Sequence, residues 1–132
     1  MATLFTRIIK GEIPSYKCAE DKDFYAFLDI NPIKRGHTLV VPKKEVDYFF
    51  DLSDEDIAAM QVFAKKVAQA IKKVIPCKKV AQAVIGLEVD HAHIHLVPLE
   101  NEGELFSGKH VKLSDEEMAS TANAILEAFK EI

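Results

Sequence analysis

The sequence lacks tryptophan and has only two cysteines in 132 residues, Cys18 and Cys77. Two thiols outside any CxxC pair are too few for a disulfide framework, so we expect reduced thiols and a cytoplasmic protein. No stretch approaches the ~20 apolar residues of a membrane span. The N-terminus has no basic segment followed by an apolar run, so we expect no secretory signal and no membrane partner.

An excess of positive charge is also missing. Lysine and arginine number 17 against 21 acidic residues, which gives a net charge of -4. Generic nucleic-acid binders usually carry a basic excess, so we expect no nucleic-acid partner. What remains is a chain that is 48% hydrophobic and free of repeats, which predicts one globular domain over residues 1–132.

Apolar periodicity predicts an α+β fold with a five-stranded antiparallel sheet. Short strands that follow one another with short turns favour antiparallel pairing. The two longer helices each begin at a serine with an acidic residue three positions later, the pattern of a capping box. The expected helices cover 4–9, 53–75 and a segment from 114, and the expected strands cover 16–20, 24–28, 37–41, 79–85 and 89–98.

The most informative segment holds three histidines at alternate positions, His91, His93 and His95. Side chains alternate between the two faces of a strand, so we expect the three imidazoles on one face at intervals of ~7 Å. The residues between them would pack on the core on the other face, and these are Ala92, Ile94 and Leu96.

Such a row of imidazoles suits two kinds of chemistry. A His-x-His pair can place two ligands on one zinc ion. Alternatively, a neutral imidazole can attack an electrophile while its neighbours orient it and donate protons. Histidine titrates near pH 6.5, so both protonation states are available at neutral pH. The spacing by itself leaves both possibilities open.

The segment His-Ala-His-Ile-His-Leu-Val at 91–97 resembles the signature of the histidine triad (HIT) nucleotide-binding proteins. Residues 5–15 are similar to the family's N-terminal segment, and residues 27–32 with 36–43 are similar to its central block. The three blocks occur in the family's order. With a single triad, the chain looks like the Hint-type branch of phosphoramidases and nucleotide hydrolases.

This resemblance implies a HIT-like fold, a homodimer in which two sheets join, and hydrolysis at the α-phosphate of a nucleotide. Typical substrates are nucleoside phosphoramidates, adenylates and dinucleoside polyphosphates. By position, His93 would be the nucleophile and would form a nucleotidyl-histidine intermediate. His95 would contact phosphate, His91 would orient the nucleophile, and His37 is similar to the family's fourth histidine. The resemblance implies no metal and no cofactor.

The resemblance also implies a nucleotide-binding surface. Asp29 matches the acid that accepts hydrogen bonds from the ribose hydroxyls. The apolar positions around the base, a purine by expectation, match Leu4, Phe5, Ile8, Phe27 and Ile30. Without the resemblance, most of these apolar side chains would be read as core, Asp29 as a turn residue, and His37 as a side chain at a strand edge.

The chain departs from the family at three positions that hold zinc ligands in many bacterial members. Thr3 and Thr6 stand where those members have a Cys-x-x-Cys pair, and Glu45 replaces a histidine. We therefore expect no structural zinc.

A second departure lies just before the triad, where the loop is shorter than usual. Leu87 stands in place of a glutamine that would contact phosphate, and Glu88 in place of a hydroxyl that would help the leaving group. These changes favour a second hypothesis, a nucleotide-binding module with little turnover. A third is a zinc protein that uses His91 and His93 with Glu88 or His37, which elemental analysis would test.

Overall fold

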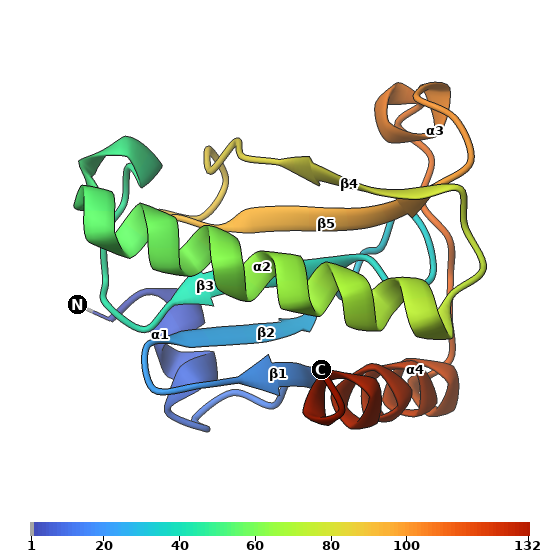
Figure 1. Cartoon of the computed structure of the whole chain (residues 1–132), viewed down its shortest axis with the longest axis horizontal. Coiled ribbons are helices and arrows are strands. Elements are labelled where there is room, and N and C mark those ends of the chain that lie inside the picture. Colours follow the sequence, from blue (N-terminus) through green and yellow to red (C-terminus); the bar gives the residue numbers. More distant parts are fainter. Residues whose placement is uncertain (1) are drawn as a thin grey trace.

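The computed structural model describes residues 2–132 and has a five-stranded antiparallel sheet at its centre, as Figure 1 shows. The strand order is β1-β2-β3-β5-β4, which leaves β1 and β4 at the edges. Every neighbouring pair is antiparallel, so the predicted α+β class is confirmed. The strands are β1 (Lys17–Glu20), β2 (Phe24–Leu28), β3 (Thr38–Pro42), β4 (Lys79–Ala83) and β5 (Ile94–Leu99).

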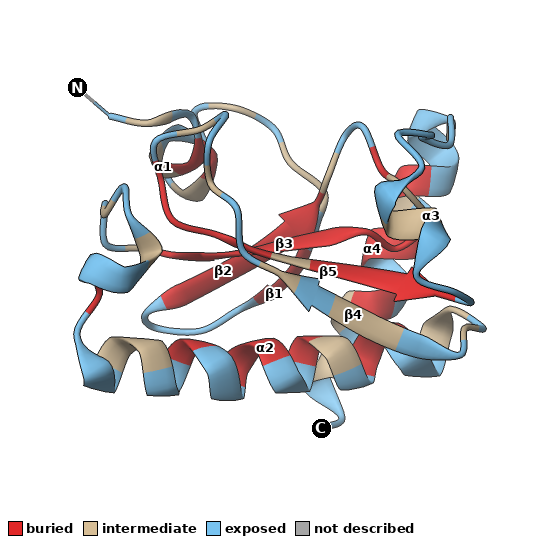
Figure 2. Ribbon diagram, turned by 90° about the horizontal axis from the view of Figure 1, so that it is seen from above, coloured by how far each residue is buried: buried red, intermediate tan, exposed pale blue. Residues whose placement is uncertain are grey.

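The helices cover the sheet unequally. Helices α2 (Asp54–Val74) and α4 (Asp115–Lys130) pack on one face, and the short α1 (Leu4–Ile9) lies on the other (Figure 2). The structure also contains a 3-10 turn, η1 (Phe49–Asp51), and a one-turn helix, α3 (Gly103–Phe106). Among residues 2–132, no helix combines the length and the hydropathy needed to cross a bilayer.

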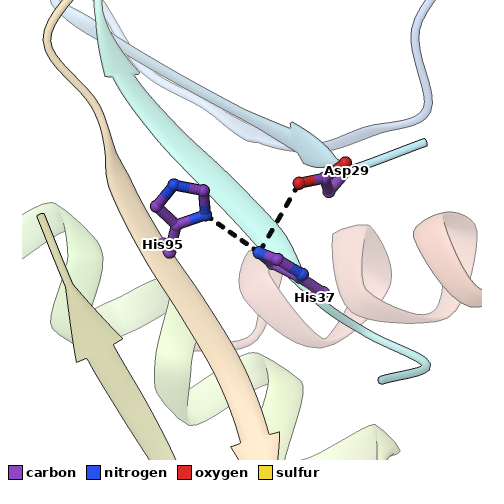
Figure 3. A group of neighbouring side chains, drawn as sticks. All are labelled: Asp29, His37 and His95. Carbon is purple, nitrogen blue, oxygen red and sulfur yellow. Dashed lines mark hydrogen bonds and ion pairs between the residues drawn. The ribbon is translucent and has the colours of Figure 1, made fainter. Parts of the chain in front are cut away.

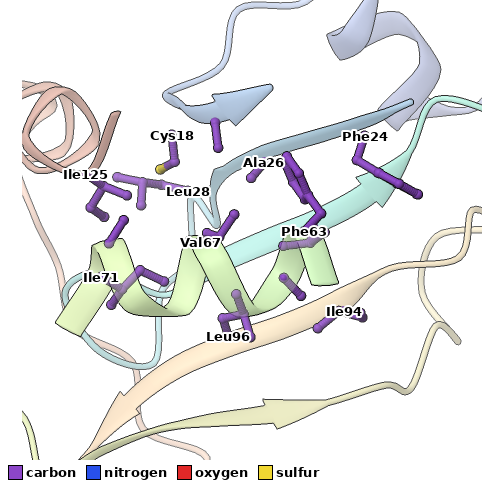
Figure 4. Close-up of a cluster of buried hydrophobic side chains, with 14 of the residues drawn as sticks. Cys18, Phe24, Ala26, Leu28, Phe63, Val67, Ile71, Ile94, Leu96 and Ile125 are labelled. Carbon is purple, nitrogen blue, oxygen red and sulfur yellow. The ribbon is translucent and has the colours of Figure 1, made fainter. Parts of the chain in front are cut away.

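The larger core lies between the sheet and helices α2 and α4, as Figure 4 shows. Helix α2 buries residues three and four apart, among them Phe63, Val67 and Ile71, so that one continuous stripe faces the strands. Each such side chain stabilises the fold by roughly 1.5–3 kcal/mol when it leaves water. This core fixes the sheet that carries the histidines.

Serine caps define where the two long helices begin. The Ser114 hydroxyl accepts the Glu117 N–H and the Glu117 carboxylate accepts the Ser114 N–H, so the predicted capping box is complete in α4. At α2 only half of it forms. The Ser53 hydroxyl accepts the Asp56 N–H, while the Asp56 carboxylate accepts a hydrogen bond from Lys44 at 2.8 Å.

The predicted boundaries were wrong around the histidine row. Strand β4 ends at Ala83 instead of residue 85, and β5 begins at Ile94 instead of residue 89. Residues 84–93 lie outside the ladder. At the end of this segment the backbone donors have other acceptors, since the His91 N–H donates to the Val89 carbonyl at 2.8 Å and the Ala92 N–H to the Val46 carbonyl at 2.7 Å. Only His95 of the three histidines therefore lies in a regular strand.

The alternation of side chains persists nevertheless. Ala92, Ile94 and Leu96 are buried in the core under α2 and α4, as predicted. In β2, Phe24, Ala26 and Leu28 join the same core, whereas Tyr25 and Phe27 belong to a smaller cluster with α1. Continuing this period of two places Asp29, His37 and the histidine row on the α1 face of the sheet.

Candidate active site

Four buried or half-buried histidines gather on the α1 face of the sheet. His37 enters at the start of β3 and lies beside His95 of β5, with ring centroids 5.2 Å apart. His93 and His95 are closer still, at 4.9 Å, because their side chains lean together. The structure thus brings the fourth predicted histidine to the predicted row.

A tight turn delivers His37 to this place. Gly36 has φ +93°, a conformation that residues with a Cβ rarely adopt. A Cβ at this position would also lie 2.9 Å from Ile75 Cγ1. The Asp29 N–H then donates to the His37 carbonyl at 3.0 Å, which extends the β2–β3 pairing by one step.

The hydrogen bonds of His93 define which of its nitrogens can react. His93 Nδ1 lies 2.8 Å from the carbonyl oxygen of His91, and a carbonyl only accepts hydrogen bonds. Nδ1 therefore carries the proton, and in the neutral ring the lone pair is on Nε2. The Phe5 ring meets the His93 ring edge to face, with centroids 5.1 Å apart, and holds it in this orientation.

His37 and His95 form a hydrogen-bonded relay (Figure 3). The Ile33 N–H donates to His37 Nδ1 at 3.1 Å, so the proton of a neutral His37 is on Nε2. His37 Nε2–H then donates to His95 Nδ1 at 3.0 Å, which leaves the His95 proton on Nε2. The relay therefore supplies an N–H donor on His95 next to the lone pair of His93.

Burial keeps both members of the relay uncharged. Desolvation lowers the pKa of His37 to about 4, although the Asp29 carboxylate opposes this shift. Desolvation likewise lowers the pKa of His95, reinforced by His93 and opposed by Asp29 and Glu88. Near neutral pH His37 is thus a neutral imidazole, as its tautomer requires.

Asp29 lies at the rim of the cluster with its side chain only partly buried. Its Oδ1 accepts the Asn31 N–H at 2.8 Å, and its Oδ2 is 3.7 Å from His37 Nε2. Both oxygens retain lone pairs for further hydrogen bonds.

Asp29, His37 and His95 also offer three possible metal-ligand atoms within 4.8 Å of one another. A metal ion on His37 Nε2 would displace its proton to Nδ1, where the Ile33 N–H already points. Histidine ligands normally donate their second N–H to an acceptor, so this environment opposes a metal. The arrangement fits a chain of hydrogen bonds between neutral imidazoles better than a metal centre.

His91 is fully buried and lies one step back from the cluster. Its Nε2 is 2.8 Å from the Pro42 carbonyl oxygen, and its Nδ1 is 2.7 Å from the Thr3 hydroxyl. Thr3 and Thr6 in turn both bond to Glu45. Thr3, Thr6 and Glu45 occupy the positions that hold zinc ligands in many bacterial members of the family, and here they form a hydrogen-bonded cluster next to His91. The lack of structural zinc stays a prediction.

The apolar candidates divide into two groups. Phe5, Ile8 and Phe27 are buried in the smaller cluster under α1, where they form a wall next to the histidines. Leu4 is 46% exposed and Ile30 is 83% exposed, so neither is core. These two are free to contact a ligand.

The loop before the triad is outside the sheet. Leu87 is 85% exposed, and Glu88 is also exposed. The Glu88 carboxylate acts to raise the pKa of His95, which places its negative charge within electrostatic reach of the cluster.

Sequence reasoning gave no role to His110 and did not pair Thr3 with His91. His110 Nδ1 donates to the Asn31 carbonyl at 2.8 Å, and the His110 ring lies within electrostatic reach of His37, whose pKa it acts to lower. The hydrogen bonds His110–Asn31 and Thr3–His91 each join residues more than 70 positions apart, so no local sequence pattern predicts either of them.

Together these side chains provide a nucleophilic nitrogen, an adjacent N–H donor and a carboxylate at the rim, and so define an α+β protein with a histidine-based site on one sheet face. The family model of the HIT domain matches residues 10–102, and the chain belongs to this family. The expected resemblance is therefore confirmed.

The relatives include proteins with and without an assigned activity. Adenosine 5′-monophosphoramidase HNT1 of Saccharomyces cerevisiae is 41% identical over 104 residues, covering 76% of this chain and 65% of that protein. An uncharacterised HIT-like protein of Methanocaldococcus jannaschii is 38% identical, covering 85% of this chain and 91% of that protein. The crystal structure of a Hit-like protein from Bartonella henselae superposes with a TM-score of 0.82 at 29% identity, covering 96% and 95% of the two chains.

Proposed function

We propose that the protein is a nucleotide hydrolase that cleaves the bond between the α-phosphate and its substituent, with His93 as the nucleophile. The observation that carries this proposal is the hydrogen bond from His93 Nδ1 to the His91 carbonyl. This bond leaves the lone pair of His93 on Nε2, next to the ring of His95 with its N–H donor. The relative named as a monophosphoramidase supports the hydrolase class. Nucleoside phosphoramidates, adenylates and dinucleoside polyphosphates are the substrate classes we propose.

The reaction runs in two displacements. His93 Nε2 attacks the α-phosphorus of a phosphoramidate, the bond to the amine breaks, and the amine leaves with a proton taken from solvent, which the attacking water of the second step returns. Water then attacks the phosphorus of the nucleotidyl-histidine, the bond to Nε2 breaks, and the nucleoside monophosphate is released. The His95 N–H stabilises negative charge on the phosphate oxygens in both steps.

The direct test of this function is incubation of the wild-type protein with adenosine 5′-phosphoramidate and measurement of AMP release by chromatography. Calorimetry that detects AMP binding without turnover across phosphoramidates, adenylates and dinucleoside polyphosphates would instead select a binding module. That alternative is motivated by Leu87 and Glu88, which depart from the family pattern.

We further propose that the Asp29 carboxylate accepts hydrogen bonds from the ribose hydroxyls. The base, a purine, would lie between the exposed side chains of Leu4 and Ile30 and the buried wall formed by Phe5, Ile8 and Phe27. The support is the rim position of Asp29, which keeps lone pairs free, and the exposure of the two aliphatic side chains.

Asp29→Asn should lower kcat/KM for an adenosine phosphoramidate by about tenfold, because hydrogen bonds to a charged acceptor are worth about 1–2 kcal/mol more than neutral ones. The amide still accepts the Asn31 N–H, so the turn survives. The loss should be smaller with the 2′-deoxyadenosine substrate, which offers one hydroxyl fewer. Equal losses on both substrates, measured by steady-state kinetics, would assign Asp29 a role unconnected with the ribose.

The proposed homodimer is supported by the free edge of the sheet. Strand β4 pairs with β5 on one side only, and Val84 and Ile85 beyond it are exposed. An unpaired edge with apolar neighbours can pair with a second copy and so join two sheets. Sedimentation equilibrium should give twice the chain mass of 14.8 kDa, and a mass of one chain would refute the dimer.

The cytoplasmic location and the single domain over residues 1–132 are parts of the same proposal. Cys18 and Cys77 are both free thiols, as is usual in a reducing compartment. The single domain is supported by the 96% of the chain that superposes on one relative. Cell fractionation and limited proteolysis, respectively, test these two points.

A further inference from the structure

We propose that Thr3 is a positioning residue of the site: its hydroxyl donates to His91 Nδ1, fixes the tautomer of His91, and through the His91 carbonyl holds His93 in its reactive orientation. This inference rests on the proposed function for its kinetic consequences. The hydrogen-bond assignment itself stands independently of the reaction.

The first step concerns the His91 ring. Nε2 lies 2.8 Å from the Pro42 carbonyl oxygen, which only accepts, so Nε2 carries a proton. Burial lowers the pKa of His91, against the opposing effects of the Pro42 carbonyl and of Glu45, so the ring is neutral near pH 7. Its Nδ1 must then accept a hydrogen bond, and the atom that faces it at 2.7 Å is Thr3 Oγ1.

The second step accounts for the single proton of the Thr3 hydroxyl. The Thr6 N–H donates to Thr3 Oγ1 at 3.1 Å, which uses a lone pair and not the proton. The Thr6 hydroxyl donates to Glu45 Oε1 at 2.7 Å, and the Thr3 N–H donates to the same oxygen at 2.6 Å. Glu45 thus holds both threonines in place. The Thr3 proton has two possible acceptors, Thr6 Oγ1 at 3.2 Å and His91 Nδ1 at 2.7 Å, and the shorter contact directs it to His91.

The third step connects this cluster to the nucleophile. The His91 carbonyl accepts the His93 Nδ1–H at 2.8 Å, so a displacement of His91 displaces the bond that sets the tautomer of His93. The Phe5 ring contacts both imidazoles, with centroids 5.7 Å from His91 and 5.1 Å from His93. Because Thr3 also caps α1, which carries Phe5, one hydroxyl fixes the helix and the imidazole together.

Three substitutions at residue 3 separate donation from helix capping. Thr3→Ser keeps both roles, and Thr3→Val loses both. Thr3→Asp still caps the helix with its carboxylate but can only accept from His91. A donor role therefore predicts a fall in kcat of about tenfold in Thr3→Val and Thr3→Asp with KM not raised, and near-normal kcat in Thr3→Ser.

The pH profile of Thr3→Asp provides a second signature. A carboxylate facing Nδ1 favours the His91 cation and raises its pKa. The charged and titratable groups that act on His91 are Glu45, in the same direction, and His93, in the opposite direction. The acid limb of kcat should therefore move to higher pH in Thr3→Asp and remain in place in Thr3→Ser.

Ser114→Asp is the matched control, because it makes the same exchange at the cap of α4. It should leave kcat and the pH profile unchanged. If Thr3→Asp turns over like Thr3→Ser, the role of Thr3 is capping alone and the proposal is overturned.

Long-range ¹H–¹⁵N spectra of the histidine rings give a readout that needs no substrate. The wild-type protein should show His91 protonated on Nε2 only, and Thr3→Asp should show both nitrogens protonated. Wild-type His91 protonated on Nδ1 would refute the assignment. If the wild-type protein fails to turn over substrate while the spectra agree, the proposed function fails and the tautomer assignment is upheld.

Discussion

His93→Ala should abolish nucleotide hydrolysis, with a fall in kcat of at least about 10³-fold, while the protein still binds AMP. Removing a nucleophile eliminates the covalent route, and neighbouring groups cannot replace it. His95 lacks the same capacity, because its Nδ1 accepts the His37 proton and its Nε2 carries its own. AMP release by chromatography and AMP binding by calorimetry measure the two halves of this expectation.

The variant must be shown to fold, because His93 is buried and its loss leaves the His91 carbonyl without a partner. An unsatisfied buried carbonyl costs about 1–3 kcal/mol, so we expect a lower Tm with an unchanged circular dichroism spectrum. His93→Gly gives a sharper test, since free imidazole can occupy the vacated space and attack the phosphorus itself. Added imidazole should restore part of the activity of His93→Gly. A wild-type rate in His93→Ala would exclude His93 as the nucleophile.

The helices were predictable because their signals are local. The stripe of α2 repeats at three and four residues over the whole helix, and serine caps mark both long helices. Helix α3 gives no such signal. It has a single turn, and the Glu104 carboxylate binds the Glu100 and Asn101 N–H groups before it.

The histidine row shows what alternation alone can establish. It predicted the faces of Ala92, Ile94 and Leu96 because an extended chain alternates whether or not it is paired. It predicted the strand boundary wrongly because pairing depends on the partner, and the Ala92 N–H binds Val46 in place of a strand. The face on which a side chain lies and the pairing of its backbone in a sheet are therefore separate properties of the same segment.

The contacts that complete the site depend on register between distant segments. Leu39 pairs with His95, and this register places His37 diagonally opposite the third histidine of the row. A shift of one residue would turn His37 to the other face. Thr3 and His91 are 88 residues apart, and no local pattern joins them.

The second large effect should follow from His95→Ala, with kcat lower by about 10²–10³-fold and KM little changed. The His95 N–H stabilises negative charge that develops on the phosphate oxygens in the transition state, and loss of one such donor lowers kcat by about this factor. His37 fixes the tautomer of His95: the His37 Nε2–H donates to His95 Nδ1, so the proton of His95 is on its own Nε2. His95→Gln, whose amide can donate, should recover part of the rate.

The leaving group distinguishes what the His95 proton does. If His95 stabilises the phosphate oxygens, His95→Ala should slow aryl and alkyl phosphoramidates by the same factor. If it protonates the departing amine, the loss should shrink as the amine becomes a better leaving group, because a good leaving group needs no proton in the transition state. We expect the first outcome, because His95 could not regain a proton that it gave to the amine. The pKa of His37 is about 4, so near neutral pH the His37 ring carries a single proton, and this proton is already donated to His95 Nδ1. A loss that depends steeply on the amine would assign His95 the role of general acid.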